Sequence, residues 1–481
     1  MFKFDNSFYN EFSADFYQEI MPKNFPHAQL IYFNDDLAKV LGIAKKQLSS
    51  VEKAAILSGQ KIHPCAKPIA LAYGGHQFGN FVPQLGDGRA ILLGEIINQN
   101  NQRFDLQLKG SGPTKFSRRG DGFLTLKAAI RELIIGEALH NLQIPTSRIL
   151  SLVITNEAVY RESVNMGAVI ARVADSHIRV GTFEYWAFKG DQKSLHNLCN
   201  YVAKRHFPQE NSSAISIKTL FYDIVLAQAN LIAKLQANGF IHGVMNSDNM
   251  AIGGQALDFG PCAFLDEYDE NKVFSAIDYN GRYAYKNQSA IAKWNLWILA
   301  NCLHLIYANA EELLEILNLF SEKFEEKYYK IMSQKLGFEH QIPKKLIADL
   351  LQIMQHQKSD YHQTFFKLSD DLLFKKNQAI KGEEYKNWLL KWRDLLANEY
   401  DFKNNNIVKK IAVKMRQHNP YLIARNHIVQ QVIEAGDNLD FQPLKNYLRA
   451  LKKPFICDEK YLSYHNPPKA NQKILQTFCG T

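Results

Sequence analysis

Asn249 and Asp258, an amide and a carboxylate, lie on either side of a Gly-Gly pair at positions 253–254. Such a pair favours a two-residue hairpin turn, because these turns need positive φ angles that glycine adopts at little steric cost. Counted outward from the turn, Met250 faces Leu257 and Asn249 faces Asp258. Directly opposed residues have Cβ atoms roughly 4.5–5.5 Å apart, so the two oxygen-bearing side chains could share one hard cation such as Mg²⁺. A polar hairpin base without a metal is the alternative interpretation.

A second group of residues, Gly86, Gly88 and Arg89, has the composition of an anion site. The two glycines bracket a tight turn, and an apolar strand is expected at 90–93. Glycine lets backbone N–H groups approach an anion closely, and an arginine adds a bidentate phosphate donor. Ordinary hairpins show the same pattern, so its meaning depends on the residues that follow.

Those residues begin with a strand at 104–109, in which Phe104, Leu106 and Leu108 alternate with polar side chains. This period of two predicts a half-buried strand. Lys109 would point from its polar face toward whatever the glycine turn holds, or simply into solvent. The next loop is rich in cations and glycine, and it is either an anion-binding loop or a solvated one. Its polar and glycine residues are Lys115, Arg118, Arg119, Gly120, Asp121 and Gly122.

A helix is expected from Leu126 to about His140, with Thr125 as its N-cap. Glu132 sits in the middle of this helix and could pair with Lys109. Such a pair would orient the amine toward a phosphate. A surface pair within the helix is the alternative.

Further strands are expected at 151–154, 158–161 and 168–173. The last of them carries Arg172, and Arg179 lies in the segment that follows. The second half of the chain then shows helical spacing of its apolar residues.

The order of these elements is that of an α+β, protein-kinase-like two-lobe fold with a helical C-terminal extension. We expect a mostly β N-terminal lobe over 1–185 and a helical lobe with the metal hairpin over 186–330. The helical extension would cover 331–481.

The kinase signature offers a more specific comparison. His242 and Asn249 have the separation of the histidine and asparagine in the kinase catalytic loop, and Asp258 begins an Asp-Phe-Gly triplet. Val244, however, stands where a kinase has its catalytic aspartate, and valine cannot accept a proton. Ordinary kinase chemistry is therefore in doubt.

Composition sets the broader limits. The chain has 481 residues, a formal net charge of +9 and 46% hydrophobic residues, which is ordinary for a soluble globular protein. The basic residues are dispersed, so we expect no nucleic-acid partner. The most apolar window, near 290–310, carries Lys293 and Asn295, so we expect a buried helix and no membrane association. The N-terminal residues do not have the pattern of a signal or transit peptide, which predicts a cytoplasmic protein.

Six cysteines are scattered without a metal-binding spacing, which predicts neither a zinc site nor a disulfide scaffold. Cys262 and Cys479 could be redox-active, although inert thiols are the simpler expectation.

Over nearly its whole length the chain resembles the selenoprotein O family, called YdiU in bacteria. The stretches that carry the resemblance are Gly75-His-Gln-Phe-Gly, Gln84-Leu-Gly-Asp-Gly-Arg-Ala, Leu108-Lys-Gly-Ser-Gly, His242-Gly-Val-Met-Asn-Ser-Asp-Asn-Met, and Asn419-Pro with Arg425-Asn426. The resemblance implies a pseudokinase-like enzyme that transfers AMP from ATP to Ser, Thr or Tyr hydroxyls of proteins, with Mg²⁺ or Mn²⁺. Transfer of UMP from UTP, favoured by Mn²⁺, is also implied for bacterial members.

The same resemblance implies roles for individual residues, with the nucleotide reversed relative to kinases and its α-phosphate open to attack. Glu132 would fix Lys109, Asn249 and Asp258 would bind the metal, and Asp248 would be the proton acceptor. Cys479 lies near the position where some relatives carry selenocysteine. The residues implied to hold ATP are Gly86, Gly88, Arg89, Lys109, Asp121, Gly122, Arg172, Arg179 and Asp258.

These assignments fit the chemistry of nucleotidyl transfer, in which positioning and charge neutralisation supply most of the catalysis. Asp248 adjoins Asn249, and successive side chains of an extended segment point to opposite faces. Asp248 would therefore stay clear of the metal and be able to take a proton. A kinase-type phosphotransferase and an inactive ATP-binding scaffold are the alternatives.

Overall fold

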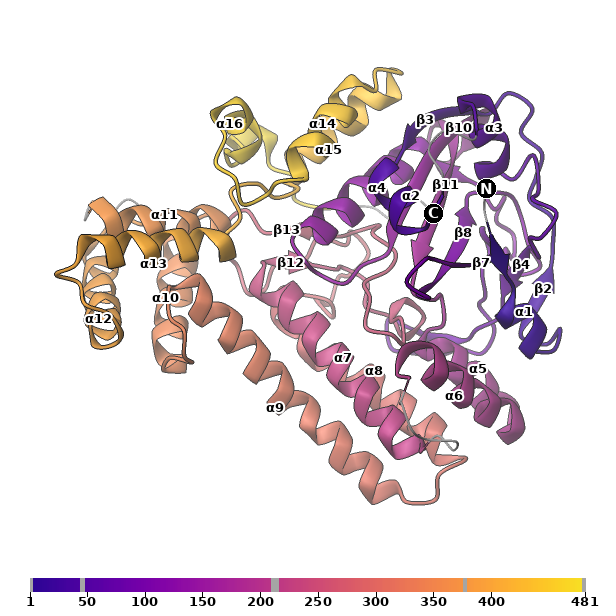
Figure 1. Ribbon diagram of the computed structural model, residues 1–481, viewed down its shortest axis with the longest axis horizontal. Helices are drawn as coiled ribbons and strands as arrows, with labels where there is room; N and C mark the ends of the chain where they lie inside the picture. Colours follow the sequence, from indigo (N-terminus) through magenta and orange to yellow (C-terminus); the bar gives the residue numbers. More distant parts are fainter. Residues whose placement is uncertain (1–2, 44–47, 209–215, 375–378, 478–481) are drawn as a thin grey trace.

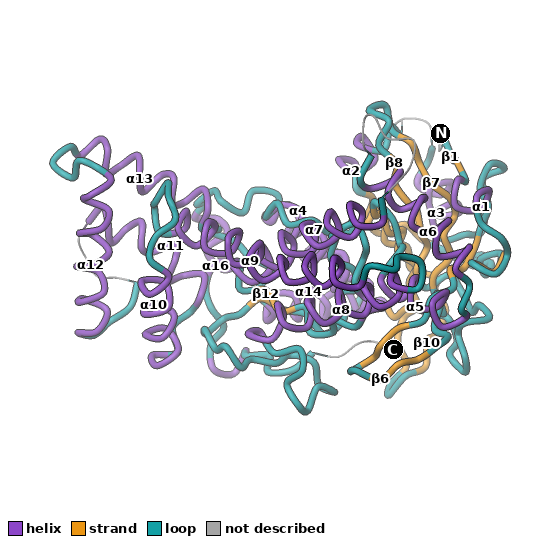
Figure 2. Tube along the Cα trace, turned by 90° about the horizontal axis from the view of Figure 1, so that it is seen from below, coloured by secondary structure: helices purple, strands orange, loops and turns teal. Residues whose placement is uncertain are grey.

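The computed structural model describes residues 3–43, 48–208, 216–374 and 379–477 of the chain. The strands of the large sheet gather at one end of an elongated molecule and a group of helices forms the other end, with long helices between them (Figures 1 and 2). A large antiparallel sheet followed by a helical C-terminal part confirms the α+β class expected from the sequence.

One antiparallel sheet dominates the first part of the chain. Its strands are β1 (Phe4–Asp5), β2 (Tyr17–Glu19), β3 (Gln29–Phe33), β4 (Ile69–Leu71), β7 (Ala90–Ile97), β8 (Arg103–Lys109), β9 (Leu124–Thr125), β10 (Arg148–Tyr160) and β11 (Val164–Ala174). They follow the order β2-β4-β7-β8-β11-β10-β3, with β1 beside β7 and β9 beside β11. The central strand is β8, where Lys109 pairs with Ala90 on one side and with Ile170 on the other.

Two strands expected separately, at 151–154 and 158–161, are one continuous strand, β10. Its ladder with β11 shifts register between Ile154 and Ala158, and Asn156 there adopts a left-handed φ of 56°. A bulge carries the extra residues without ending the strand.

Helix α4 (Leu126–Asn141) confirms the helix expected after the cationic loop. Thr125 caps it, since its Oγ1 accepts the N–H of Ala128 at 3.3 Å. Leu133 and Ile134 are fully buried, and the helix packs against β10 and β11.

The opposite face of the sheet is covered by α2 (Asp35–Val40) and α3 (Ser50–Leu57). Neighbouring residues of one strand therefore enter different cores: Leu92 belongs to the cluster on the α4 side and Leu93 to the other. The strand expected at 104–109 is confirmed as β8, but the expectation that it is half-buried was wrong, because helices cover both faces of the sheet and the polar side chains of β8 are buried.

The middle of the chain is helical. Its helices are α5 (Val180–Lys189), α6 (Gln192–His206), α7 (Ile217–Ala237), α8 (Gln288–His304) and α9 (Ala310–Lys335). Helix α7 packs along α8 and α9 (Figure 1), and Gly239 follows it with a φ of 62°. Within the described ranges, no helix is long and apolar enough to cross a membrane.

The C-terminal helices are α10 (Lys344–Gln357), α11 (Tyr361–Phe374), α12 (Glu383–Glu399) and α13 (Asn405–His418). They share a second core with the ends of α7 and α9 and with the segment 263–285. Trp388 and Trp392 stack within that core, with ring centroids 5.8 Å apart. The chain then returns through α14 (Asn426–Asp437) and α15 (Gln442–Leu451) to pack on α4. The last helix is α16 (Leu462–His465).

The Asn419-to-Asn426 stretch, whose role the sequence left open, connects these parts. Arg425 is buried and lies 2.7 Å from Asp266 and 2.8 Å from Asp360. Asn426 Oδ1 accepts a hydrogen bond of 2.9 Å from Arg131 on α4. The stretch therefore ties the C-terminal helices to the segment that follows Asp258 and to α4.

Candidate active site

Four charged residues from different elements meet at one end of β8. Lys109 Nζ lies 2.6 Å from Glu132 Oε2 and 2.6 Å from Asp258 Oδ1. Arg172, on the neighbouring strand β11, places Nη1 2.7 Å from the same Asp258 oxygen and 3.3 Å from Glu132 Oε1. The contact between Lys109 and Glu132 predicted from the sequence is thus confirmed, and Arg172 completes a buried ion cluster.

Asp258 is the carboxylate on which these cations converge. Its backbone has a left-handed φ of 63°. Burial opposes ionisation, but the charges of Arg172, Lys109 and Arg179 outweigh it and hold the pKa of Asp258 well below its ordinary value. The side chain is still 24% exposed, so a ligand can reach an ionised carboxylate here.

A second row of buried polar groups supports the cluster. Arg172 Nη2 donates to Gln107 Oε1 at 2.6 Å, and Gln107 Nε2 donates to Asp87 Oδ2 at 2.9 Å. Sequence reasoning missed Gln107 and Asp87, although their polar character on a strand and in a glycine turn was visible.

Arg179 lies beside this row. Its guanidinium stacks 4.3 Å from the ring centroid of Tyr73, and its Nη2 lies 3.8 Å from Asp87 Oδ1. Within the described chain, Nη2 is buried without a hydrogen-bond acceptor. An unsatisfied cationic donor at this depth is costly, and an anionic ligand would supply the missing acceptor.

The glycine turn is closely packed. A Cβ on Gly86, whose φ is 87°, would lie 2.3 Å from the ring of Phe116, and one on Gly88 would lie 2.9 Å from the Phe116 carbonyl oxygen. Thr114 Oγ1 donates to Asp87 O at 2.8 Å. The close packing of the cationic loop is therefore enough to explain why both positions are glycine. The turn also reaches β8, because the N–H of Gly110 donates to Arg89 O at 2.7 Å.

The contacts of Asp121 and Gly122 are with the cationic loop and its neighbours rather than with the buried ion cluster. Asp121 forms two hydrogen bonds with Arg161, at 2.7 and 3.0 Å, and accepts the Phe123 N–H at 2.9 Å. A Cβ on Gly122 would lie 2.2 Å from the carbonyl carbon of Gly112. These contacts brace the cationic loop, and Arg161 was not identified as a partner from the sequence.

The predicted hairpin register was wrong by one residue. Met250 bridges to Ala256 rather than Leu257, and the turn closes with Gly254 N–H donating to Ala251 O at 3.1 Å. Asn249 does not extend a strand opposite Asp258, because it ends a 3₁₀ turn over Ser247–Asn249.

The register differs from the predicted one because Gly253 and Gly254 pack against helices α6 and α7. A Cβ on Gly253 would lie 2.6 Å from the His206 ring, and one on Gly254 would lie 2.9 Å from Ala227 Cβ. The two glycines therefore allow close approach to α6 and α7 rather than forming the centre of a two-residue turn.

Asn249 and Asp258 are nevertheless held by connected segments. His242 joins the two stretches through its Nε2, which lies 2.8 Å from Leu257 O. Asn249 Nδ2 donates to Val244 O at 3.2 Å, so its Oδ1 is the amide atom that a cation could take. Among the described residues, no group of three or more His, Cys, Asp or Glu side chains could hold a metal ion. Asn249 and Asp258 alone would supply two side-chain oxygens, so a cation here would take further ligands.

Asp248 precedes Asn249 in the same 3₁₀ turn and is 7% exposed. Its Oδ2 accepts a hydrogen bond of 3.2 Å from Gln77 Nε2. Its Oδ1 is buried with no hydrogen-bond partner in the described structure. Burial raises the pKa of Asp248 to about 6, although the Gln77 hydrogen bond and the charge of Arg179 act in the opposite direction.

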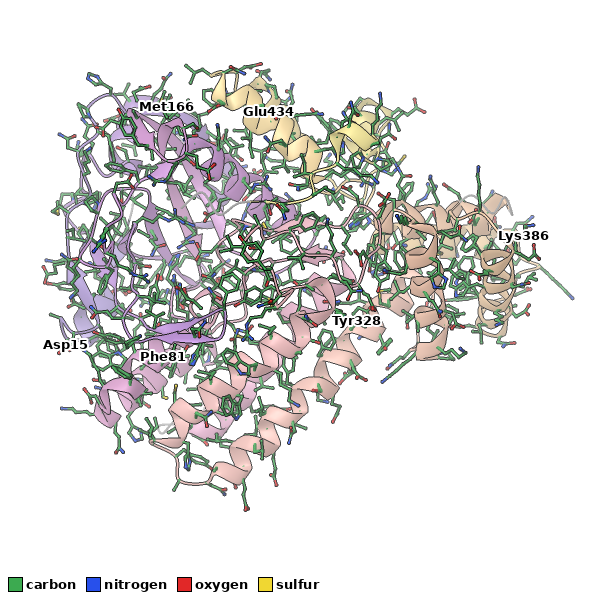
Figure 3. All side chains as sticks on the ribbon, turned by 180° about the vertical axis from the view of Figure 1, so that it is seen from behind. Asp15, Phe81, Met166, Tyr328, Lys386 and Glu434 are labelled. Carbon is green, nitrogen blue, oxygen red and sulfur yellow. The ribbon has the colours of Figure 1, made fainter. Side chains whose placement is uncertain are left out.

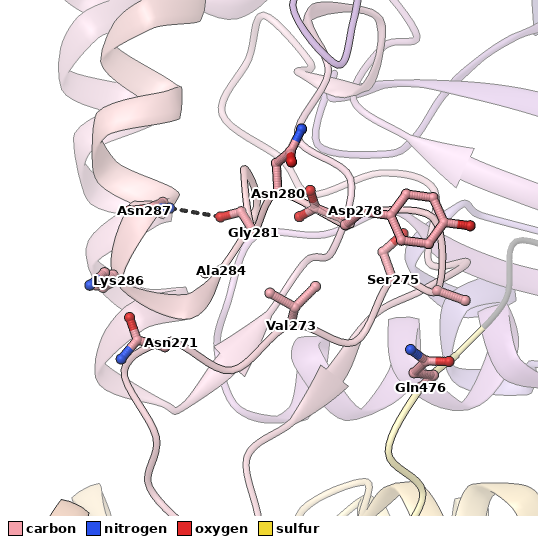
Figure 4. A pocket seen from close by; sticks show the side chains of 12 residues that line it. Asn271, Val273, Ser275, Asp278, Asn280, Gly281, Ala284, Lys286, Asn287 and Gln476 are labelled. Atoms are coloured by element: carbon pink, nitrogen blue, oxygen red, sulfur yellow. Dashed lines mark hydrogen bonds between the residues drawn. The ribbon is translucent and has the colours of Figure 1, made fainter.

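Two further features lie outside this cluster. A cavity of about 590 Å³ is lined by the loop 271–287 and by Gln476, with Asn287 Nδ2 donating to Gly281 O at 2.8 Å across one side (Figure 4). None of the residues of the ion cluster lines it. Cys262 is fully buried, whereas Cys479 lies outside the described residues.

Comparison with known proteins places the chain in the protein nucleotidyltransferase class of enzymes. The model of the family described as "Protein adenylyltransferase SelO" matches residues 2–452, and the chain belongs to that family. Similar proteins named "Protein nucleotidyltransferase YdiU" come from several bacteria. The protein of Rhodopseudomonas palustris is 43% identical, covering 100% of this chain and 99% of its own. Those of Maridesulfovibrio salexigens and Bacillus cereus (strain B4264) are each 42% identical, covering 99% of this chain and 98% of their own.

Proposed function

We propose that the protein transfers AMP from ATP to Ser, Thr or Tyr hydroxyls of protein substrates. The observation that carries this proposal is the buried group of Lys109, Arg172 and Arg179 at the end of β8. One of its nitrogens, Arg179 Nη2, lacks a hydrogen-bond acceptor within the described chain. A triphosphate is the anion that the family's chemistry would place there. Gly86, Gly88, Arg89, Asp121 and Gly122 would complete the site from the two adjoining loops.

The donor set fits a divalent ion that also binds the nucleotide. Both cations that contact Asp258 use its Oδ1, so Oδ2 is the oxygen open to a metal, together with Asn249 Oδ1. Mg²⁺ prefers oxygen ligands and usually takes several of them from phosphates and water, and Mn²⁺ accepts the same ligand types. When bound, the ion would neutralise phosphate charge. We propose Mg²⁺ or Mn²⁺ as the cofactor on this basis.

The reaction would proceed at the α-phosphorus. The acceptor oxygen forms a bond to that phosphorus, the bond to the bridging oxygen of the β-phosphate breaks, and pyrophosphate leaves. Lys109, Arg172 and Arg179 would hold the phosphates, and Glu132 would fix Lys109. The hydroxyl proton would pass to Asp248, whose unpartnered Oδ1 is suited to receive it. General-base help of this kind contributes about 10²–10⁴-fold.

We further propose that the architecture is kinase-like, with lobes over 1–185 and 186–330 and an extension over 331–481. Lysine on a sheet strand, glutamate on the following helix and an Asp-Phe-Gly triplet support this reading. Val244 replaces the kinase catalytic aspartate, which favours nucleotidyl over phosphoryl transfer. An inactive ATP-binding scaffold would have the same nucleotide site.

Intact-mass spectrometry tests the proposal. Purified protein and a bulk protein substrate are incubated with ATP, and separately with UTP, in the presence of Mg²⁺ or Mn²⁺. The proposal expects a mass gain of one adenylyl group from ATP; a gain from UTP would extend it to uridylyl transfer. A gain of one phosphoryl group would establish a kinase instead, and no gain with any metal would establish a scaffold.

A further inference from the structure

The Gly75-His-Gln-Phe-Gly stretch, which the proposed nucleotide site does not use, forms a small hairpin over the turn that carries Asp248. Its strands are β5 (Gly75–Gln77) and β6 (Asn80–Val82), with Gln77 paired to Asn80. Phe78 and Gly79 form the two-residue turn, with φ angles of 51° and 86°. Both central residues of a type I′ turn need positive φ, so Gly79 is suited to its position.

Three successive residues of the Asp248 turn are each held by this hairpin. The His76 N–H donates to Ser247 Oγ at 2.7 Å, and the Phe78 N–H donates to Asn246 Oδ1 at 3.1 Å. Gln77 Nε2 donates to Asp248 Oδ2 at 3.2 Å.

The alternation of side chains along β5 explains why Gln77 is the residue that reaches Asp248. Residues i and i+2 of a strand point to the same face, and here Gly75 and Gln77 both face the turn. A Cβ on Gly75 would lie 2.9 Å from Asp248 Cβ and 3.2 Å from its Oδ1. Glycine at 75 therefore leaves room for the carboxylate, while the longer side chain of Gln77 contacts its far oxygen.

The hairpin is also held by contacts of its His76 side chain with other elements. The His76 ring contacts the Glu184 carboxylate of α5 and lies 5.1 Å from the rings of Phe81 and Trp294. Phe81, labelled in Figure 3, is exposed, and its ring centroid lies 5.5 Å from that of Phe188, which is also exposed.

We infer that Gln77 is a positioning residue for nucleotidyl transfer, which holds Asp248 Oδ2 so that Oδ1 faces the acceptor hydroxyl. A carboxylate turned by rotation about χ2 would exchange its two oxygens. The hydrogen bond from Gln77 holds Oδ2 in place. Oδ1 is then left without a hydrogen-bond partner in the described structure. This inference rests on the proposed role of Asp248 as proton acceptor.

The test combines Gln77→Met with Asp248→Ala in a double-mutant cycle. Methionine keeps the length of the side chain and removes its amide, and with it the donor to Asp248. Gln192→Met makes the same change at an exposed position on α6 and serves as the matched control. For each variant, kcat and KM for ATP-dependent AMP incorporation, ATP affinity by equilibrium titration and the unfolding midpoint are measured.

The inference expects Gln77→Met to lower kcat about 10- to 100-fold, the scale of a hydrogen bond to a charged group. ATP affinity and the unfolding midpoint should stay near those of the wild type and of Gln192→Met. In the Asp248→Ala background, Gln77→Met should have no further effect.

Three outcomes would overturn parts of the account separately. Wild-type kcat in Gln77→Met would exclude a positioning role while leaving Asp248 in place. Equal effects of Gln77→Met with and without Asp248 would show that Gln77 acts elsewhere. Full activity of Asp248→Ala would remove the proposed proton acceptor itself, and the role of Gln77 with it.

Discussion

Lys109 and Glu132, from strand β8 and helix α4, are joined by a 2.6 Å contact between Nζ and Oε2 in the buried interior. The same ammonium lies 2.6 Å from Asp258 Oδ1, so Lys109 bridges the two carboxylates. The ion cluster therefore depends on how α4 packs on the sheet.

Glu132→Gln tests that relationship. The amide keeps the shape of the side chain but loses the charge that orients Lys109. We expect kcat/KM for ATP to fall about 10- to 100-fold, since misplacing a substrate-positioning group by about 1 Å can cost 10²-fold. Steady-state kinetics measure this, with Glu162→Gln as the control at an exposed turn. Unchanged kinetics in Glu132→Gln would show that Lys109 needs no such support.

Asp258→Asn, compared with removal of divalent ions, tests the metal site. The amide lacks the charge that attracts a cation, so we expect transfer to fall at least about 100-fold, as for loss of an electrostatic catalytic group. A chelator should stop the wild-type reaction to the same extent, and added Mg²⁺ or Mn²⁺ should restore it. Wild-type rates for Asp258→Asn, or undiminished activity in chelator, would contradict this assignment.

Gly86→Ala and Gly42→Ala form a matched pair for the glycine turn. Both residues have positive φ, 87° and 72°, so each alanine should cost about 1–2 kcal/mol of backbone strain. Only Gly86 would also push a Cβ into the Phe116 ring, 2.3 Å away, whereas Gly42 has open space around it. We expect Gly86→Ala to lose about 1–3 kcal/mol more. Denaturant unfolding measures the difference, and equal losses would show that Phe116 can move aside.

Lys335→Met tests a buried amine far from the cluster. Lys335 is 1% exposed, and burial lowers its pKa from 10.5 to about 7. Between these values the unfolded state binds more protons than the folded state, so this residue's destabilising effect grows as pH falls from 10.5 to about 7. Methionine removes that effect.

This pH dependence is tested by measuring the unfolding free energies of the wild type and Lys335→Met at several pH values. The variant should be more stable by an amount on the order of 2–5 kcal/mol near pH 7, and its advantage should shrink as pH rises toward 10.5. A difference that does not change with pH would mean that the amine titrates normally in the folded protein.

The sequence was sufficient for the parts of the site that local patterns determine. Alternation along β8 and the capped helix after it placed Lys109 and Glu132, and the structure confirms the contact between them, which the sequence left as one of two alternatives. The hairpin register could not be read in the same way. Gly253 and Gly254 serve contacts with helices α6 and α7, which come from remote parts of the chain. The polar face of β8 was misread for a related reason, because the partners that bury Gln107 lie in other elements.

Following the α-phosphate and the γ-phosphate of ATP separately tests the claim of nucleotidyl transfer most directly. The protein is incubated with ATP labelled either at the α-phosphate or at the γ-phosphate, and the acceptor protein is separated and counted. Nucleotidyl transfer predicts that the α label is retained on protein while the γ label leaves as pyrophosphate. Retention of the γ label without the α label would contradict the account and establish phosphoryl transfer.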